Sequence, residues 1–251
     1  MLELDRVTKR FNGADGRAVT ALSDVSLTIA RHEMVCLVGR SGCGKTTTLR
    51  LIAGLERATH GRILLNGVPV EGPSAQRCVV FQRYTLFPWR SVLRNVAFGL
   101  EIQGVPKSKR HAIARHYLAL VGLAEQVHAF PAQLSGGMQQ RVAVARALAT
   151  DPQVLLMDEP FGALDAQTRT VLQQELIRIW QEDRKTIVFV THDIQEAALL
   201  ADRVVVMQGP PGRIQAILNC DLPRPRDKGA PAFLALCDRI HTMLEVVNGW
   251  N

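Results

Sequence analysis

The sequence predicts an α/β fold in which helices cover a mostly parallel β-sheet, and three observations lead to this prediction. Short, uninterrupted apolar runs have the composition of strands buried on both faces. Segments with helical patterns separate these runs along the chain. Because ligands of open α/β sheets lie outside the carboxyl ends of the strands, the residues that follow the runs are expected to converge on one edge. The four runs that lead into polar residues or a glycine loop are MVCLV (34–38), CVVF (78–81), VLLM (154–157) and TIVFVT (186–191).

The remaining elements follow from local patterns. The chain begins with two alternating segments, LELDRV and VTALSDVSLTI, which are typical of an antiparallel sheet on one flank. Residues 83–150 carry no pattern of a buried strand and predict a helical insert. A further strand is expected at 204–207, and helices are expected at 45–54, 91–103, 107–122, 137–149, 166–182 and 194–201.

These elements predict a single domain over residues 1–251. An α/β core would comprise 1–82 and 151–220, with a helical subdomain at 83–150. After Cys220 the segment DLPRPRDKGAP is rich in proline and charge, so residues 221–251 are expected to form an extended tail before one last helix.

Composition excludes several other classes of protein. The 251 residues contain no apolar run of 18, so no segment is expected to span a bilayer, and the N-terminus resembles neither a signal nor a transit peptide. Five cysteines without a C-x-x-C pair indicate free thiols in a reducing cytoplasm. The net charge of +7 is compatible with nucleic acid, anionic lipid or a nucleotide ligand and does not choose among them.

The segment GRSGCGKT satisfies the pattern G-x-x-x-x-G-K-[ST] of a phosphate-binding loop. In such a loop the backbone N–H groups wrap the phosphates, Lys45 reaches the β and γ oxygens, and the Thr46 hydroxyl binds Mg²⁺. Cys43 lies beside a helix start and near Lys45, and both features favour a reactive thiolate. The residues expected to contact the nucleotide here are Gly39, Arg40, Ser41, Gly42, Cys43, Gly44, Lys45, Thr46 and Thr47.

Three further strand ends supply the residues of a nucleoside triphosphatase. Asp158 in VLLMDEP is expected to bind Mg²⁺, and Glu159 to act as the general base that polarises the attacking water. Gln82 and His192 follow two other strands and are predicted to position the water or the γ-phosphate, with Gln82 also a candidate Mg²⁺ ligand. Phe11 is either a ring that stacks on the base or a core aromatic.

A second glycine turn, LSGGM (134–138), precedes an Ala-rich helical segment. Ser135 can cap that helix, and Gly136 and Gly137 leave backbone N–H groups accessible to an anion. One nucleotide needs only one phosphate loop. The second turn therefore binds another anion or completes a nucleotide site on another molecule.

In this order the motifs resemble those of the ATPase subunits of ABC transporters. The resemblance covers nearly the whole chain and includes GRSGCGKTT, Gln82, LSGGM, VLLMDEP, GALD (162–165) and His192. The family usually reads LSGGQ, and Met138 replaces the last residue. Three longer segments are similar to the ATPases of nitrate, sulfonate, taurine and bicarbonate importers. They are EGPSAQRCVVFQRYTLFPWRSVLRNVAFGLE, DEPFGALDAQTR and PPGRIQAILNCDLPRPR.

This resemblance implies a P-loop ATPase with a RecA-like parallel-sheet core, which binds ATP and Mg²⁺. Two copies would pair head to tail, so that Ser135, Gly136, Gly137 and Met138 of one copy cover the nucleotide of the other, with Asp165 near the interface. The resemblance also implies that the chain attaches peripherally to a transmembrane permease, at the cytoplasmic face of the bacterial inner membrane. A periplasmic solute-binding protein would be an indirect partner, and nucleic acid is not an expected partner.

Two other classes remain as alternatives. The first is a soluble ABC ATPase that acts on nucleic acid or ribosomes, although such proteins resemble tandem cassettes or cassettes split by coiled coils. The second is a small-molecule P-loop kinase, which would leave LSGGM unexplained. The segment RYTLFPWRSVLRN after Gln82 combines Tyr84, Phe87 and Trp89 with arginines, which favours a docking surface over a small core.

Overall fold

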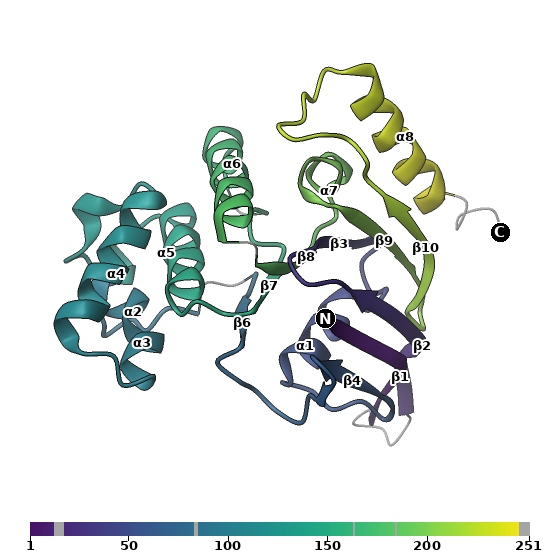
Figure 1. The fold of residues 1–251 in the computed structure, drawn as a ribbon, viewed down its shortest axis with the longest axis horizontal. Coiled ribbons are helices and arrows are strands. Elements are labelled where there is room, and N and C mark those ends of the chain that lie inside the picture. Colours follow the sequence, from purple (N-terminus) through teal and green to yellow (C-terminus); the bar gives the residue numbers. More distant parts are fainter. Residues whose placement is uncertain (13–17, 83–84, 163, 184, 246–251) are drawn as a thin grey trace. The chain divides into compact units, whose positions relative to one another are not determined.

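The computed structural model describes residues 1–12, 18–82, 85–162, 164–183 and 185–245, in two compact units (Figure 1). The first unit comprises Met1–Ser74 and Thr186–Asn251, and the second comprises Ala75–Lys185. Arg83, Tyr84 and Ala163, which belong to predicted functional segments, lie outside the described residues.

The first unit contains the antiparallel flank that the alternating N-terminal segments predict. Its strands are β1 (Leu2–Asn12), β2 (Ala18–Ile29), β4 (His60–Leu65) and β5 (Val68–Pro69), in the order β2-β1-β4-β5. Leu2 pairs with Ile29 of β2 and with Leu65 of β4, and all three side chains are buried. The sequence prediction missed β4 and β5, since HGRILL has three exposed residues and no alternating apolar pattern.

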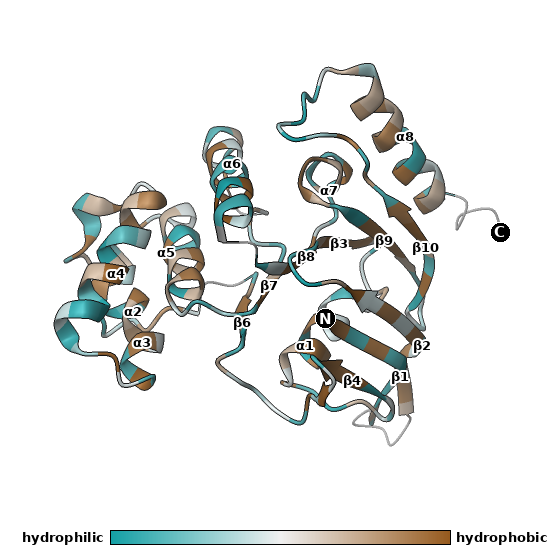
Figure 2. Ribbon diagram, in the orientation of Figure 1, coloured by the Kyte–Doolittle hydropathy of each residue, from teal (hydrophilic) through white to brown (hydrophobic). Residues whose placement is uncertain are grey.

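The first unit also contains strands buried on both faces. β3 (Met34–Gly39) pairs in parallel with β8 (Thr186–Val190) and with β9 (Arg203–Gln208), and β9 pairs antiparallel with β10 (Arg213–Asn219). Every residue of β3 and β8 is buried, and both strands are hydrophobic in Figure 2. The helices of this unit are α1 (Lys45–Ala53), α7 (Ile194–Leu200) and α8 (Pro231–Glu245).

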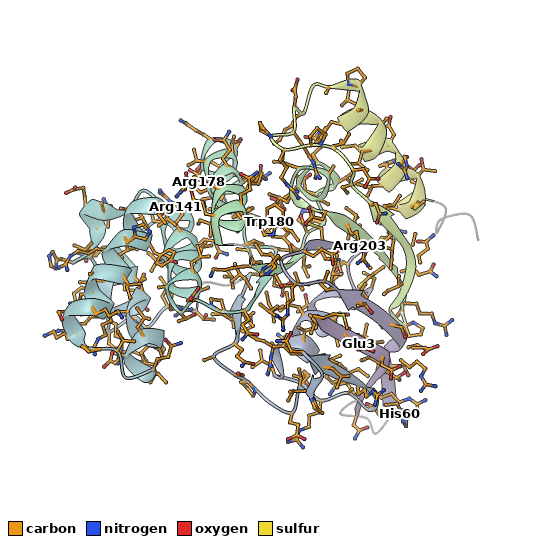
Figure 3. All side chains as sticks on the ribbon, viewed as in Figure 1. Glu3, His60, Arg141, Arg178, Trp180 and Arg203 are labelled. Atoms are coloured by element: carbon orange, nitrogen blue, oxygen red, sulfur yellow. The ribbon has the colours of Figure 1, made fainter. Side chains whose placement is uncertain are left out.

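Arg203 connects the two sheets of the first unit. From the start of β9, its guanidinium donates to the Thr28 carbonyl of β2 and to the Glu33 carboxylate (Figure 3). α7 and α8 lie side by side in Figure 1. The segment between Cys220 and Pro231 has no regular structure, and α8 follows it where a last helix was predicted.

The second unit combines two parallel strands with most of the helices. β6 (Arg77–Val80) pairs with β7 (Val154–Asp158). The helices, with η marking a 3₁₀-helix, are α2 (Val92–Val96), α3 (Phe98–Ile102), α4 (Lys107–Leu120), η1 (Ala124–Gln126), η2 (Pro131–Gln133), α5 (Gly136–Ala149) and α6 (Ala166–Asp183). Between 85 and 150 the described residues contain no strand, as predicted. Arg141 of α5 donates to the carbonyl of Val121 at the end of α4 (Figure 3).

One predicted helix is wrong in its extent. The segment 91–103 forms α2 and α3 with a break at Ala97, which ends the first and precedes the second. Gly99, a poor helix former, lies where a Cβ would be 2.2 Å from the Cγ2 atom of Thr150. Close packing against the end of α5 therefore leaves no room for a side chain at Gly99.

The two compact units differ in their boundaries from the predicted core and insert. β6, β7 and α6 belong to the unit that holds the helices, because α5 contacts β6 directly. The division into a core of 1–82 and 151–220 and a subdomain of 83–150 stays a prediction. Among the described helices, none is long and apolar enough to cross a lipid bilayer.

Candidate nucleotide site

The phosphate loop of the first unit lies between β3 and α1, as its sequence context predicts. Gly44 is the N-cap residue of α1 and has a φ of 93°, a conformation that favours glycine. The Lys45 side chain is 7% exposed, and its ammonium donates to the carbonyls of Gly39 at 2.7 Å and Arg40 at 3.1 Å. The lysine is thus held over the loop that would cradle the phosphates. Ser41, Gly42 and Thr46 are exposed at this helix start, and Thr47 is half-buried.

Cys43 is buried in the phosphate loop. Its side chain is 1% exposed, and its Sγ atom lies 3.8 Å from the Lys45 ammonium. A Cβ on Gly39 would lie 2.6 Å from this sulfur and 2.4 Å from the carbonyl oxygen of Met207. The thiol therefore fills the space beneath the loop, and the predicted reactivity of Cys43 stays a prediction.

His192 follows β8 at the same edge of the first unit as the phosphate loop. Leu37 and Val190 are partners in the parallel pair β3–β8, so both strands end at this edge. The Thr191 amide donates to the Leu37 carbonyl at 3.2 Å, which extends the pairing by one residue. His192 itself is exposed.

A buried network fixes the backbone on either side of His192. The Thr191 hydroxyl donates to the Glu196 carboxylate at 2.5 Å and accepts from the Asp193 amide at 3.0 Å. Asp193 caps α7 by accepting from the Glu196 amide at 3.1 Å. Sequence reasoning missed Thr191 and Glu196. The D-x-x-E spacing of residues 193–196, which is close to that of a capping box, could have indicated Glu196.

Phe11 is a half-exposed residue of β1 and not a core aromatic. Its side chain is 37% exposed, and the Lys9 ammonium lies 4.6 Å from the ring centroid. Of the two interpretations of Phe11, burial in the core is thus excluded. Stacking on the base stays a prediction.

The second unit brings two predicted catalytic residues into contact. Val80 and Met157 are partners in the parallel pair β6–β7, and Gln82 and Glu159 each lie two residues further along. The Gln82 amide donates to the Glu159 carboxylate at 3.3 Å. Glu159 has a φ of 46°, an uncommon value for a non-glycine residue that is often found at functional sites. Asp158, the last residue of β7, is 7% exposed.

The second glycine turn begins α5, as predicted. Ser135 is the N-cap residue, and its hydroxyl accepts from the Met138 amide at 3.3 Å. A Cβ on Gly137 would lie 3.2 Å from the Cδ2 atom of Leu164, so the turn packs tightly on the segment before α6. Gly136, Gly137 and Met138 are half-buried, and Ser135 is exposed.

Two neighbouring residues support this turn. Asp165 begins α6 by accepting from the Thr168 amide at 2.9 Å, and this hydrogen bond lowers the pKa of its carboxyl below the ordinary value. Gln140, which sequence reasoning missed, is 1% exposed and donates to the Phe81 carbonyl at 3.4 Å. It joins the first turns of α5 to the residue before Gln82. A glutamine on a helix face gives no signal of such a bond.

The residues that the sequence predicts for nucleotide hydrolysis are divided between the two units. The first unit has the phosphate loop with Lys45 and His192, and the second has Asp158, Glu159 and Gln82 together with a glycine turn of its own. Phosphate loop, strand-end carboxylates and parallel strands define the class as an α/β P-loop nucleoside triphosphatase.

Comparison with known proteins identifies the family. Residues 22–162, more than half of the chain, match the family model described as ABC transporter. An uncharacterized ABC transporter ATP-binding protein of Methanocaldococcus jannaschii is 53% identical over 97% of this chain and 91% of its own. The nitrate import ATP-binding protein of Synechocystis is 46% identical, covering 97% and 94%, and the taurine import ATP-binding protein of Pseudomonas entomophila is 49% identical, covering 88% and 84%.

Solved structures agree with these relatives. The dimeric structure of a bacterial ABC transporter cassette matches with a TM-score of 0.82 and 32% identity over 89% of this chain and 100% of that chain. A second structure of that cassette, in a post-hydrolysis state bound to ADP and phosphate, matches with a TM-score of 0.79 and the same identity and coverage. The chain belongs to the ABC transporter family, and it is an ATP-hydrolysing subunit.

Proposed function

We propose that this chain powers the import of a small anion through a membrane-spanning permease, with two copies sharing each nucleotide. The observation that carries the proposal is a complete phosphate loop in a chain that has a second glycine turn at the start of α5. Nitrate and taurine importers are among the relatives, which supports a small anionic solute and attachment to the inner membrane through the permease. A periplasmic binding protein would deliver the solute.

In the proposed site Lys45 and the loop amides hold the β- and γ-phosphates of ATP. Mg²⁺ supplies charge neutralisation on the phosphates, and it prefers hard oxygen ligands. Three oxygen ligands of this kind would hold the Mg²⁺: the Thr46 hydroxyl, the Asp158 carboxylate and the Gln82 amide oxygen.

Glu159 accepts the proton of the attacking water in this proposal. Its hydrogen bond from Gln82 orients the carboxylate and joins it to a residue that follows the neighbouring strand. His192, exposed beside the phosphate loop, would contact the γ-phosphate. Ser135 and the amides of Gly136 and Gly137 would close over the γ-phosphate of the partner copy, with Asp165 near the same interface.

The proposed docking surface for the permease lies on the second unit. Trp89 is 71% exposed, although its ring packs 5.7 Å from that of Phe87. Two cavities of about 420 and 470 Å³ share Trp89, Arg94, Lys107 and His111 in their walls. An exposed tryptophan among cationic side chains is typical of a binding hot spot, which supports the prediction from the sequence.

Co-expression tests the function. The tagged chain is produced with and without a multi-span permease of a nitrate or taurine importer, and membranes are separated by sedimentation. We expect the chain in the membrane fraction only when the permease is present. Sedimentation with ribosomes, or release by nuclease treatment, would instead support the alternative of an ABC ATPase that acts on nucleic acid.

A further inference from the structure

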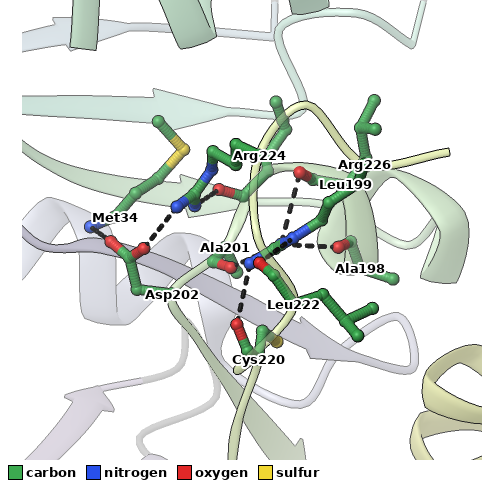
Figure 4. A network of polar contacts seen from close by, with 10 residues as sticks. Met34, Ala198, Leu199, Ala201, Asp202, Cys220, Leu222, Arg224 and Arg226 are labelled. Carbon is green, nitrogen blue, oxygen red and sulfur yellow. Dashed lines mark hydrogen bonds and ion pairs between the residues drawn. The ribbon is translucent and has the colours of Figure 1, made fainter. Parts of the chain in front are cut away.

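Two arginines of the C-terminal tail bind the end of α7 (Figure 4). Arg226 is 9% exposed, and its Nη1 atom donates to the carbonyls of Ala198 at 2.7 Å, Ala201 at 2.7 Å and Leu199 at 3.3 Å. Arg224 donates through Nη2 to the Leu200 carbonyl at 2.5 Å. Arg226 also donates to the tail's own backbone, at the carbonyls of Cys220 and Leu222.

The four carbonyls of α7 that these arginines bind are those that a helix leaves without partners. The last carbonyls of an α-helix have no intrahelical donor, and they carry the negative end of the helix dipole. Residues 198–201 are the last three residues of α7 and its C-cap. A cation that donates several hydrogen bonds satisfies these carbonyls and also offsets the negative end of the dipole. The tail therefore caps the C-terminal end of α7.

The arginine pair also reaches the strand that leads into the phosphate loop. The Asp202 carboxylate accepts from Arg224 at 2.7 Å and from the Met34 amide at 2.8 Å (Figure 4). Met34 begins β3, whose other end is the phosphate loop. The tail, the end of α7 and the start of β3 therefore form one bonded cluster.

The opposite end of α7 lies directly after His192. α7 has seven residues, which corresponds to about two turns, so little flexibility separates its two ends. At its first turn Glu196 bonds to Thr191, on one side of His192, and Asp193 caps the helix on the other side. A displacement of α7 along its axis would break both contacts.

We infer that Arg226, assisted by Arg224, is a positioning residue for ATP hydrolysis that holds His192 in place through α7. This inference rests on the proposed role of His192 at the γ-phosphate. The competing account is that the arginines only attach the tail, while the contacts of Thr191 and Glu196 suffice to place His192. The two accounts predict different kinetics.

The test uses MgATP hydrolysis by the purified full chain. Arg226→Met keeps the length of the side chain and removes every donor. Arg226→Lys keeps the charge and some of the donors. Arg239→Met is the matched control, because Arg239 is an exposed arginine of α8 in the same unit. Each substitution is combined with His192→Ala in a double-mutant cycle.

We expect Arg226→Met to lower kcat by about tenfold or more with the KM for ATP nearly unchanged, and Arg226→Lys to restore part of the loss. In the His192→Ala background the same substitution should have little further effect, because both residues act through one group. If the fold-loss of kcat in the double variant equals the product of the two single losses, the inference is overturned, while the role of His192 stays intact. A normal kcat for His192→Ala would overturn the role of His192 and the inference with it.

A second measurement keeps the inference testable if Arg226→Met folds poorly. Arg224→Met removes the bonds to Leu200 and Asp202 and leaves Arg226 in place. Hydrogen exchange at the amides of Glu196 and Ala197 reports on the first turn of α7. We expect faster exchange there in Arg224→Met than in Arg239→Met. Faster exchange confined to residues 221–245, with unchanged α7 amides, would contradict the inference.

Discussion

The chain has two glycine turns before helices, and they differ in what they can bind alone. The turn before α1 has left-handed backbone at Gly42 and Gly44 together with Lys45, whose ammonium is held above the loop. The turn before α5 has its cap filled by Ser135, and residues 134–140 contain no charged side chain. The first turn therefore offers a cation to a triphosphate, and the second does not. The second turn therefore fits a nucleotide that another loop already holds.

The largest effect is expected from Glu159→Gln, which leaves both turns unchanged. Glutamine keeps the size of the side chain and removes the base, so ATP should bind while turnover falls by about 10²–10⁴-fold, the usual contribution of a general base. Steady-state hydrolysis and ATP binding are measured on the same preparation. The bound ATP should also hold the dimer together. Wild-type turnover would exclude this role for Glu159.

The next effect separates the two turns by their affinity for ATP. Lys45→Met removes the ammonium that donates to the loop carbonyls of Gly39 and Arg40, so ATP affinity of the single chain should fall by about 10–100-fold, as for loss of one charged hydrogen bond of about 1.5–3 kcal/mol. Ser135→Arg in the second turn should leave that affinity unchanged. Titration with a fluorescent ATP analogue measures both, with Arg50→Met on the exposed face of α1 as control.

If Ser135→Arg weakens ATP binding by the single chain as much as Lys45→Met does, the second turn contacts a nucleotide in its own chain. The difference between the two turns would then have to be explained in another way.

The smallest effect concerns a surface that contacts neither turn in the proposal. Trp89→Ala should weaken assembly with the permease by about 2 kcal/mol, or roughly 30-fold, which is the loss expected at a hot spot. Because Trp89 is 71% exposed, the melting temperature of the Trp89→Ala variant should differ little from that of the wild type. Co-purification with the permease is compared with that of Leu234→Ala, an exposed apolar residue of α8. A large fall in melting temperature would show that Trp89 is a core residue.

The fold was predictable where apolar residues form an uninterrupted run or alternate along a strand, as in β2, and not where neither pattern is present. Strands β3, β7 and β8 carry uninterrupted apolar runs, because both of their faces are buried. β10, RIQAILN, is buried at a single residue, so its sequence has no such run, and the prediction missed it. Gly99, two residues after the break at Ala97, packs against Thr150, about fifty residues away, and no local pattern contains this contact.

The same difference holds for the site. Residues of the phosphate loop and of β7 were predictable, since the chemistry requires particular residue types at fixed spacing. Gln140 and Arg226 act through bonds to backbone carbonyls, and these bonds leave no sequence pattern. The burial of Cys43 likewise depends on Gly39 and on Met207, a residue of a distant strand.

The most direct test of the account is a mixture of two defective chains. Lys45→Ala spoils the first turn and Ser135→Arg the second, so neither chain alone can form an intact shared site. A mixed dimer retains one such site, made of the intact first turn of one chain and the intact second turn of the other. Ser91→Arg replaces another N-cap serine of the second unit and serves as the control for loss of a cap. ATP-dependent dimerisation is measured by analytical ultracentrifugation. The account predicts that dimers return on mixing, and a mixture that dimerises no more than either variant alone would contradict it.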